Sequence, residues 1–446
     1  MKIQVPLISR PWKIAVVLLL AGSTTAIAQD RLALRGATII PIVGERIVGG
    51  TILISDGRIE AVGKDIEIPV EAKVIDATGR FIMPGMINVH SAAGMSQANE
   101  QNANVPFLSV VDSIDPIADF FEESRRNGVT TAAVVPGNST MIGGRAAIVK
   151  TAGSYVNDML VKRDAGIKIS LAPTTGTSRM SHFARLRREL LKAQKPEEET
   201  SIEKPAEEVK PEGEPAEAPK PEGGETPETP GATPAPSAQA ETEKATREAL
   251  VSLLKGEMPA IIYCETSMDV SQALALVDEF KLKPILVLGR DCYKAAKLVA
   301  DRKLPVVLDS TMVYWRTDPI TRKEEKIVLP KIFSDAGASY VFQVADSGTS
   351  LGTHYYWYQA TTAVRYGMSA DAALKALTFD SAKLLGIDDS VGSIETGKDA
   401  DLVILSGEPL SVSTWVETTI VGGKVVYQKS EDAELRLLFN PEEDTN

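Results

Sequence analysis

The spacing of apolar and polar residues changes its period twice along the chain. Residues 31–80 form short alternating runs separated by turn residues such as Asp56-Gly57, which is typical of a small antiparallel sheet. From Pro84 onward, short apolar runs alternate with longer amphipathic segments, as they do in the strand–helix units of a parallel sheet. Beyond residue 390 the short β runs return. The pattern therefore predicts a strand–helix body that is flanked in sequence by two β segments.

The strand–helix body spans residues 81–389. Short apolar runs predict strands at 86–89, 130–135, 146–149, 167–171, 260–263, 284–288, 306–308 and 339–345. Amphipathic segments predict helices at 116–126, 179–193, 242–256, 268–280, 293–301, 354–366 and 370–385. Eight or so units in roughly 300 residues favour a closed (β/α)8 barrel of the TIM type over an open sheet. The predicted fold class is α/β.

One segment of the body has a composition that cannot form a core. Residues 195–244 hold ten prolines, 14 Glu and 5 Lys, and almost no large apolar side chains. Such a segment buries too little apolar surface to offset the entropy of ordering it, so we expect a disordered acidic insertion. Two interpretations stay open, a tether that docks a partner and a solvated loop that the fold tolerates.

The first residues have the pattern of a secretory signal. Lys2, Arg10 and Lys13 lie before or at the start of the apolar run Ile14–Ala21, and small residues follow at 26–28. The run is too short for a membrane helix. We therefore expect a signal peptide at 1–28 that is cleaved near Ala28, a periplasmic or secreted protein, and no membrane span in the mature chain. Residues 431–446 are predicted to form a tail.

Charge and cysteine content narrow the function classes. The formal charge is −12, and most of it lies in the acidic insertion. The remaining charge is mild and shows no basic stripe of the kind that a nucleic-acid surface needs, so no nucleic-acid partner is predicted. Two cysteines, Cys264 and Cys292, cannot make a disulfide framework. They are predicted either to form one bond in an oxidising compartment or to remain buried thiols.

Several stretches together resemble one protein family. They are PGMINVH at 84–90, RNGVTTAAVVPG at 126–137, VADSG at 344–348 and YGMSADAALKALTFDSAKLLGIDDSVGSIETGKDADLVILSGEP at 366–409. The chain resembles the imidazolonepropionase-like branch of the amidohydrolase superfamily over about residues 31–430, except for the acidic insertion. The resemblance implies that both chain ends, 29–80 and 390–430, build a small β-sandwich beside the barrel. It also implies hydrolysis of carbon–nitrogen bonds, other than peptide bonds, in cyclic amide-type substrates.

The resemblance also implies a divalent metal site, and this chain departs from it. Family members place a His-x-His pair on the first barrel strand and one histidine on each of two middle strands. His90 matches the first histidine, but Ala92 stands at the second position. Tyr263 stands where we expect the next histidine, and Leu288 stands where the family tends to have another. A methyl group or an aliphatic side chain cannot bind a metal ion.

Two further ligands are implied by the family. A carboxylated lysine corresponds to Lys150 or Lys168, and the sequence does not choose between them. The final aspartate, which takes a proton from the metal-bound water, corresponds to Asp346. At the end of a barrel strand, Asp346 is the candidate catalytic residue. Tyr263, Glu265, Arg290 and Lys168 are predicted to line the same pocket.

The histidine count agrees with a reduced site. The chain has three histidines, His90, His182 and His354, whereas a two-metal site of this kind needs about four imidazoles. His182 is predicted to lie on the surface of a basic helix. His90, Asp346 and His354 could hold a single zinc ion; the interpretation we favour has no bound metal.

Two functions follow from these residues. The first is an exported hydrolase of cyclic amides. The second is a non-catalytic member that binds a small ligand, or that pairs with an active relative or with a second copy of itself.

Overall fold

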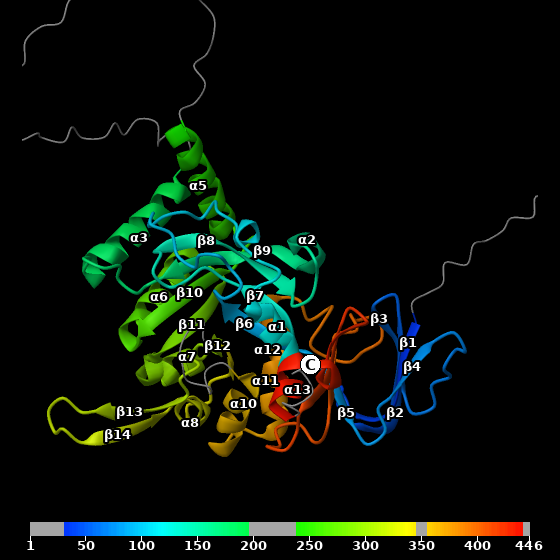
Figure 1. Cartoon of the computed structure of the whole chain (residues 1–446). Helices are drawn as coiled ribbons and strands as arrows, with labels where there is room; N and C mark the ends of the chain where they lie inside the picture. The colour runs from blue at the N-terminus through cyan, green and yellow to red at the C-terminus, as the bar shows by residue number, and fades with distance from the viewer. Residues whose placement is uncertain (1–30, 196–237, 345–354, 440–446) are drawn as a thin grey trace, which may run out of the picture.

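In the computed structural model of the chain, the described residues are 31–195, 238–344 and 355–439 (Figure 1). The predicted signal peptide, most of the predicted acidic insertion, Asp346 and His354 lie outside them. No helix of the described ranges is long and apolar enough to cross a membrane.

The two ends of the chain share one eight-stranded sheet, with order β18-β17-β16-β5-β1-β2-β3 and β4 beside β1. Its strands are β1 (Arg31–Ile39), β2 (Ile47–Ser55), β3 (Arg58–Gly63), β4 (Lys73–Asp76), β5 (Phe81–Pro84), β16 (Leu402–Leu405), β17 (Val416–Val421) and β18 (Lys424–Gln428). Antiparallel pairing of β5 with β16 joins the ends, with Ile82 opposite Ile404. Both ends therefore build one unit, as the resemblance implied, while the arrangement of that unit as a two-layer sandwich stays a prediction.

The second sheet has the order β15-β12-β11-β10-β9-β8-β7-β6. Its strands are β6 (Met86–Ser91), β7 (Val129–Val134), β8 (Ile142–Lys150), β9 (Leu160–Ser170), β10 (Ala260–Thr266), β11 (Pro284–Asp291), β12 (Val306–Val307) and β15 (Tyr340–Val341). Every predicted strand of the body has a counterpart here. The buried side chains of this sheet and of the helices packed on it form the largest hydrophobic cluster.

One strand runs against the predicted direction. β8 pairs antiparallel with both β7 and β9, whereas the other neighbouring pairs of this sheet are parallel. The prediction of a parallel strand at 146–149 was therefore wrong. The reason is the length of the two connections. Residues 135–141 before β8 and 151–159 after it are too short for the helical crossover that a parallel pair requires.

The edge strands of this sheet, β6 and β15, approach the same side chain. Tyr356, at the start of α10, is buried, and its hydroxyl oxygen lies 2.9 Å from Asn88 Oδ1 on β6. The same oxygen lies 3.1 Å from the carbonyl oxygen of Phe342, which directly follows β15. Among the described residues no backbone ladder joins β6 to β15. The structure thus has an α/β body with a mixed sheet, and full closure of the barrel stays a prediction.

Helices surround the second sheet (Figure 1). They are α1 (Asp119–Arg126), α2 (Val156–Met159), α3 (Arg179–Gln194), α5 (Ala238–Leu254), α6 (Ser267–Phe280), α7 (Ala296–Asp301), α8 (Leu329–Asp335), α10 (Tyr356–Arg365), α11 (Ala370–Leu377), α12 (Phe379–Leu385) and α13 (Ala433–Phe439). The predicted helix at 370–385 is broken at Thr378, whose φ of −130° and ψ of −89° are not helical. A projecting hairpin of β13 (Val313–Thr317) and β14 (Glu324–Val328) was not predicted.

The junction between the two sheets explains the Pro84-Gly85 motif. β5 of the first sheet ends at Pro84, β6 of the second begins at Met86, and the Gly85 N–H donates to the Asp401 carbonyl oxygen over 2.9 Å. A Cβ atom at Gly85 would lie 2.1 Å from Thr130 Oγ1 and 2.2 Å from Thr130 Cγ2 on β7. Glycine is therefore required because another strand passes against its backbone.

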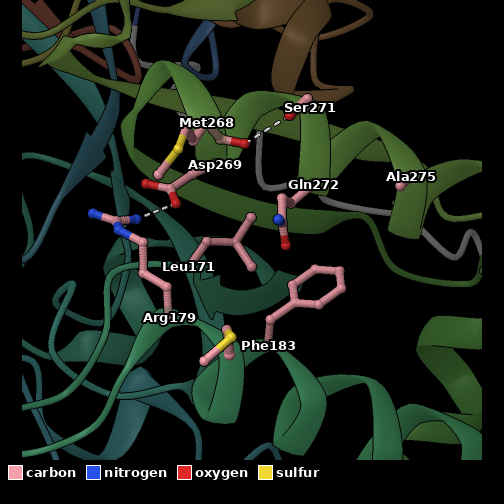
Figure 2. Close-up of a pocket in the computed structure, with 9 residues that line it drawn as sticks. Leu171, Arg179, Phe183, Met268, Asp269, Ser271, Gln272 and Ala275 are labelled. Carbon is pink, nitrogen blue, oxygen red and sulfur yellow. Dashed lines mark hydrogen bonds and ion pairs between the residues drawn. The ribbon is translucent and has the colours of Figure 1, made fainter.

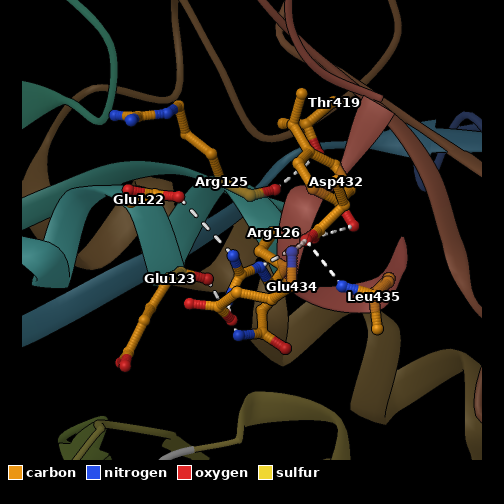
Figure 3. Close-up of polar contacts among 10 residues, drawn as sticks. Glu122, Glu123, Arg125, Arg126, Thr419, Asp432, Glu434 and Leu435 are labelled. Atoms are coloured by element: carbon orange, nitrogen blue, oxygen red, sulfur yellow. Dashed lines mark hydrogen bonds and ion pairs between the residues drawn. The ribbon is translucent and has the colours of Figure 1, made fainter. Parts of the chain in front are cut away.

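Ion pairs join the carboxyl-terminal helix α13 and the residue before it to α1 (Figure 3). Arg126 forms ion pairs with Asp432 at 2.9 Å and with Glu434 at 2.5 Å. Burial alone would raise the pKa of Asp432, but the backbone N–H of Leu435, the Tyr427 hydroxyl and the Arg126 guanidinium hold that pKa below its usual value. The predicted tail at 431–446 thus begins with residues that pack on the body.

The two cysteines are free and buried. Cys292 Sγ lies 3.1 Å from the carbonyl oxygen of Cys264, to which it donates a hydrogen bond. Burial raises the pKa of both thiols, so both remain protonated at neutral pH. Of the two alternatives left open by the sequence, the structure contains the buried thiols.

Candidate functional site

A lysine and a histidine meet inside the second sheet. His90 lies near the end of β6 and is 2% exposed, and Lys168 lies near the end of β9 and is fully buried. Lys168 Nζ is 2.8 Å from His90 Nε2 and donates a second hydrogen bond to Asn138 Oδ1 over 2.7 Å. His90 and Lys168 meet because the carboxyl ends of β6 and β9 lie at the same edge of the sheet.

The environment of His90 keeps its imidazole neutral. Burial lowers the pKa of His90 well below its ordinary value, and the positive charge of Lys168 lowers it further, which outweighs a hydrogen bond with Gln343. A neutral imidazole has one nitrogen with a free lone pair. At His90 Nε2, that lone pair accepts a hydrogen bond from the Lys168 ammonium group.

This lowered pKa predicts a pH-dependent loss of stability. The unfolded chain protonates His90 as the pH falls below about 6.5, whereas the folded chain does not until the pH falls well below that value. Stability due to His90 is thus complete above pH 6.5 and falls by up to about 1.4 kcal/mol per pH unit below it. Chemical denaturation from pH 7.5 to 5 measures this slope. We expect the His90→Gln chain to show a shallower slope; equal slopes would contradict the neutral state of His90.

Tyr263, which stands where the resemblance implies another imidazole, lies near Lys168. It lies on β10, and Lys168 Nζ is 5.5 Å from the centre of its ring. A Cβ atom at Gly289, at the end of β11, would lie 3.2 Å from the Tyr263 hydroxyl oxygen. The phenol thus lies against the end of β11. Burial and the nearby Asp309 carboxyl raise the pKa of Tyr263, so the phenol stays protonated and does not act as an anionic ligand.

Asp309 is a further polar residue that the sequence analysis missed. It directly follows the apolar run of β12, at the same edge of the sheet as Lys168. Burial raises the pKa of Asp309, and its carboxylate accepts the backbone N–H of Thr311 over 2.7 Å. The signal was available, because an acidic residue that ends a predicted barrel strand is the same pattern that singled out Asp346.

The structure also distinguishes the two candidate lysines. Lys150 Nζ lies 2.9 Å from Asp399 Oδ2 and 2.5 Å from Asp401 Oδ2, so Lys150 ties the second sheet to the first. Lys168, and not Lys150, lies beside His90. Of the two candidate lysines, the structure thus brings Lys168 to His90 and holds Lys150 at the junction of the two sheets.

Three other predicted residues have contacts that the sequence did not show. Glu265 pairs with Arg179 at 2.7 Å, and the Arg290 guanidinium lies 5.5 Å from the centre of the Tyr314 ring. His182 was predicted to be exposed, and this was wrong. His182 is 4% exposed and its Nε2 lies 2.9 Å from the Ser170 carbonyl oxygen, because it shares the inward face of α3 with Leu186, Leu190 and Ala193.

A cavity of about 610 Å³ adjoins the end of β9 (Figure 2). Its apolar wall contains Leu171 and Phe183, and exposed methionines lie at its rim. Arg179 of α3 is paired with Asp269 of α6 and so joins the two helices that border the cavity. Gln272 and Ser271 supply neutral polar groups. The cavity is of a size that takes a small organic molecule.

The described residues do not fit a resident divalent metal. Within the described ranges, no group of three or more His, Cys, Asp or Glu side chains is placed so that it could hold a metal ion. At His90 the neighbouring nitrogen belongs to an ammonium group, which donates hydrogen bonds and offers no lone pair. A closed zinc site needs about four N, S or O ligands, and Ala92, Leu288 and the protonated Tyr263 do not supply them.

Comparison with known proteins agrees with the fold and with the resemblance seen in the sequence. The amidohydrolase family model matches residues 309–426. The amidohydrolase tasK of Hapsidospora irregularis is 23% identical over 407 residues, which is 83% of this chain and 39% of that protein. An imidazolonepropionase of Porphyromonas gingivalis is 40% identical over 70 residues, 14% of this chain and 16% of that protein. The chain therefore spans well under half the length of these relatives.

A solved structure is similar to this chain over most of its length. An amidohydrolase from Thermotoga maritima is 25% identical, with a TM-score of 0.71 over 89% of this chain and 100% of that one. The family resemblance seen in the sequence is thus confirmed by independent comparisons. These comparisons support the amidohydrolase superfamily for this chain, and its α/β body resembles the TIM-like fold of that superfamily.

Proposed function

We propose that this chain is an exported, non-hydrolytic amidohydrolase-family protein that binds a small organic ligand without a catalytic metal. The observation that carries the proposal is the hydrogen bond between Lys168 Nζ and His90 Nε2, at 2.8 Å, where the family would hold its ion. The amino-terminal pattern of basic, apolar and small residues at 1–28 supports export to the periplasm or beyond.

The positive charge of Lys168 supports the absence of a catalytic metal at His90. A divalent cation at His90 Nε2 would need the lone pair that Lys168 uses, and it would lie within a few ångströms of a positive ammonium group. Two like charges so close in a buried site repel strongly, because little solvent screens them. The lysine therefore supplies one fixed positive charge in place of an ion.

The cavity between α3 and α6 supports the binding role. It opens beside the carboxyl end of β9, three residues from Lys168, and its apolar wall suits the body of a small molecule. In α/β barrels, ligands bind at this edge of the strands.

Two features of the fold are part of the same proposal. The contacts of Tyr356 with Asn88 and Phe342 support a closed barrel. The pairing of β5 with β16 supports a β-sandwich built by the two chain ends.

A turnover assay tests the proposal. The full chain, supplied in turn with Zn²⁺, Mn²⁺ and Fe²⁺, is incubated with imidazolones, cyclic imides and N-acyl amino acids. We expect no turnover above the protein-free rate. Hydrolysis that a chelator abolishes and that a metal ion restores would overturn the proposal in favour of the second candidate, a hydrolase of cyclic carbon–nitrogen bonds. That candidate is favoured by the local similarity to imidazolonepropionase and, over 48 residues, to a dihydroorotase of Mycobacterium tuberculosis.

Restoring one ligand is expected to restore nothing. Ala92→His returns the second histidine of the pair, but Lys168 still occupies His90 Nε2, and Tyr263 and Leu288 still offer no imidazole. Since a zinc site needs about four ligands, the variant should bind no ion tightly and should remain inactive. Metal titration followed by calorimetry, with the unaltered chain as control, measures this. Tight binding or strong activity from this one change would show that the site had lost only one ligand.

A further inference from the structure

Two exposed methionines border the cavity between α3 and α6. Met180 of α3 is 83% exposed, Met268 of α6 is 63% exposed, and both belong to the lining of the cavity together with Leu171 and Phe183. An apolar ligand that covers these side chains removes their surface from water, which favours binding. Flexible thioethers also adapt to the shape of a ligand and make favourable contacts with aromatic rings. This part of the lining therefore favours a largely apolar, aromatic ligand.

The charges in the lining already have partners within the chain. Among the described residues that line the cavity, Arg179 and Asp269 are the charged ones, and they pair with each other (Figure 2). Arg179 also pairs with Glu265 at 2.7 Å. The second carboxylate oxygen of Asp269 accepts the backbone N–H of Thr266 over 2.9 Å and the hydroxyl of the same residue over 3.1 Å. Neither charged group of the lining is thus left for a charged ligand.

This pairing selects against charged ligands. A charged group that leaves water for the cavity loses its hydration, and without an ion-pair partner it gains little in return. Glu265, the exposed partner of Arg179, lies outside the lining, so water screens its charge. An uncharged ligand avoids the cost of desolvating a charge.

One neutral polar side chain of the lining is available to a ligand. Ser271 Oγ donates a hydrogen bond to the Met268 carbonyl oxygen over 2.8 Å, so its proton is used within α6. Gln272 points from α6 toward the ring of Phe183 on α3, and its amide has no hydrogen bond with any residue that the structure describes (Figure 2). A side-chain amide can both donate and accept a hydrogen bond. Gln272 can therefore bind one uncharged polar group of a ligand.

We propose that the cavity between α3 and α6 binds an uncharged aromatic molecule that carries one polar group of about the size of a hydroxyl. The ring of the ligand packs against Phe183 and the two methionines, and its polar group forms a hydrogen bond with Gln272. The volume of about 610 Å³ is within the range of small-molecule sites. The inference rests on the proposed function, since it assigns a class of ligand to the same cavity.

Three probes of nearly equal shape test the class of ligand. 4-Phenylbutan-1-ol, the 4-phenylbutylammonium ion and the 4-phenylbutanoate ion share a ring and a chain, and they differ in the charge of one end. Ligand-observed NMR titration at pH 7.5 measures the affinity of the full chain for each. We expect the alcohol to bind about tenfold more tightly than either ion, because only the ions lose the hydration of a charge.

Two substitutions place the alcohol in this cavity. Gln272→Ala removes the hydrogen bond and Met180→Ser removes apolar contact, and both side chains are exposed, so neither change disturbs the core. Each should weaken binding of the alcohol by about threefold or more. Gln194→Ala, at an exposed position near the end of α3, is the matched control and should leave the affinity unchanged. Affinity that neither cavity variant alters would mean that the alcohol binds elsewhere, and it would overturn the inference.

A third substitution should reverse the preference for an uncharged ligand. Arg179→Leu leaves the Asp269 carboxylate in the lining without its arginine, so the ammonium probe should then bind more tightly than the alcohol. Arg302→Leu is the control, because it frees Asp278 of α6 outside the lining and should keep the alcohol first. In the unaltered chain, equal affinities for the three probes, tighter binding of an ion, or no binding of any probe would overturn the inference. The turnover assay decides the non-hydrolytic role separately, so the two proposals can fail independently.

Discussion

Gly85→Ala is expected to destabilise the folded chain by about 3 kcal/mol, at the upper end of what overpacking a buried site costs. The new methyl carbon would lie 2.1 Å from Thr130 Oγ1 and 2.6 Å from Thr130 Cβ. Thr130 is buried on β7 and cannot turn away, because its own Cβ is among the clashing atoms. Either the β5–β6 junction or β7 must therefore move. Chemical denaturation at pH 7.5 measures the loss.

A second change should rescue this variant. All three nearest atoms to the added carbon belong to the Thr130 side chain, so Thr130→Gly removes them all. The double variant Gly85→Ala, Thr130→Gly should be more stable than the two separate losses would give if added together. Gly63→Ala is the matched control, because there the nearest atom is the flexible end of Ile66, at 3.3 Å, and little should change. Additive losses in the double variant would show that the two residues do not touch.

Lys168→Ala is expected to lower the free energy of unfolding by about 3 kcal/mol, since it opens a cavity and leaves buried acceptors without donors. Lys168 is fully buried, and its ammonium group supplies hydrogen bonds to His90 Nε2 and Asn138 Oδ1. Lys168→Met keeps much of the volume and removes a buried charge, so it should lose less. Thermal and chemical denaturation of the three chains gives the order of stability.

The same pair of variants tests the electrostatic part of the account. The charge of Lys168 is one of the two causes that lower the pKa of His90, the larger being burial. In Lys168→Met the pKa of His90 should rise, though burial will still hold it below its ordinary value. Titration of the histidine ring protons by NMR measures this. An unchanged pKa of His90 would mean that Lys168 is not charged beside it.

The sequence was sufficient for those features that depend on local pattern. Short apolar runs located the strands of the body, and the Gly-rich and charged stretch at 392–405 located the return to the first sheet. An apolar run is visible in the sequence of the strand itself, so a strand can be recognised without knowing which residues are its neighbours in space. The pairing of β5 with β16, more than three hundred residues apart, followed from the family resemblance and not from any local signal.

Features that depend on distant neighbours were missed. The antiparallel direction of β8 follows from the lengths of two connections, and the apolar run itself is the same in either direction. The burial of His182 depends on which face of α3 meets β9, and the four basic residues near it suggested a surface instead. The break at Thr378 has no glycine or proline to mark it, whereas the hairpin of β13 and β14 was missed although its loop carries the turn signal Asp318-Pro319.

The sequence predicted only part of the candidate site. His90, Lys168 and Tyr263 were singled out, and the structure brings all three together. The choice of Lys168 over Lys150 needed the position of Asp399 and Asp401, which lie some 250 residues further along the chain and hold Lys150. Asn138 directly follows the family-like stretch 126–137, and no sequence signal pointed to its hydrogen bond with Lys168.

The central claim is that Lys168 occupies the place of a metal ion at His90, and metal content tests it most directly. The full chain is produced with zinc and manganese supplied, dialysed without chelator, and analysed for bound metals by mass spectrometry, beside a His90→Ala chain. The account predicts far less than one equivalent of any divalent metal in both. One or more equivalents in the unaltered chain, lost in His90→Ala, would contradict it.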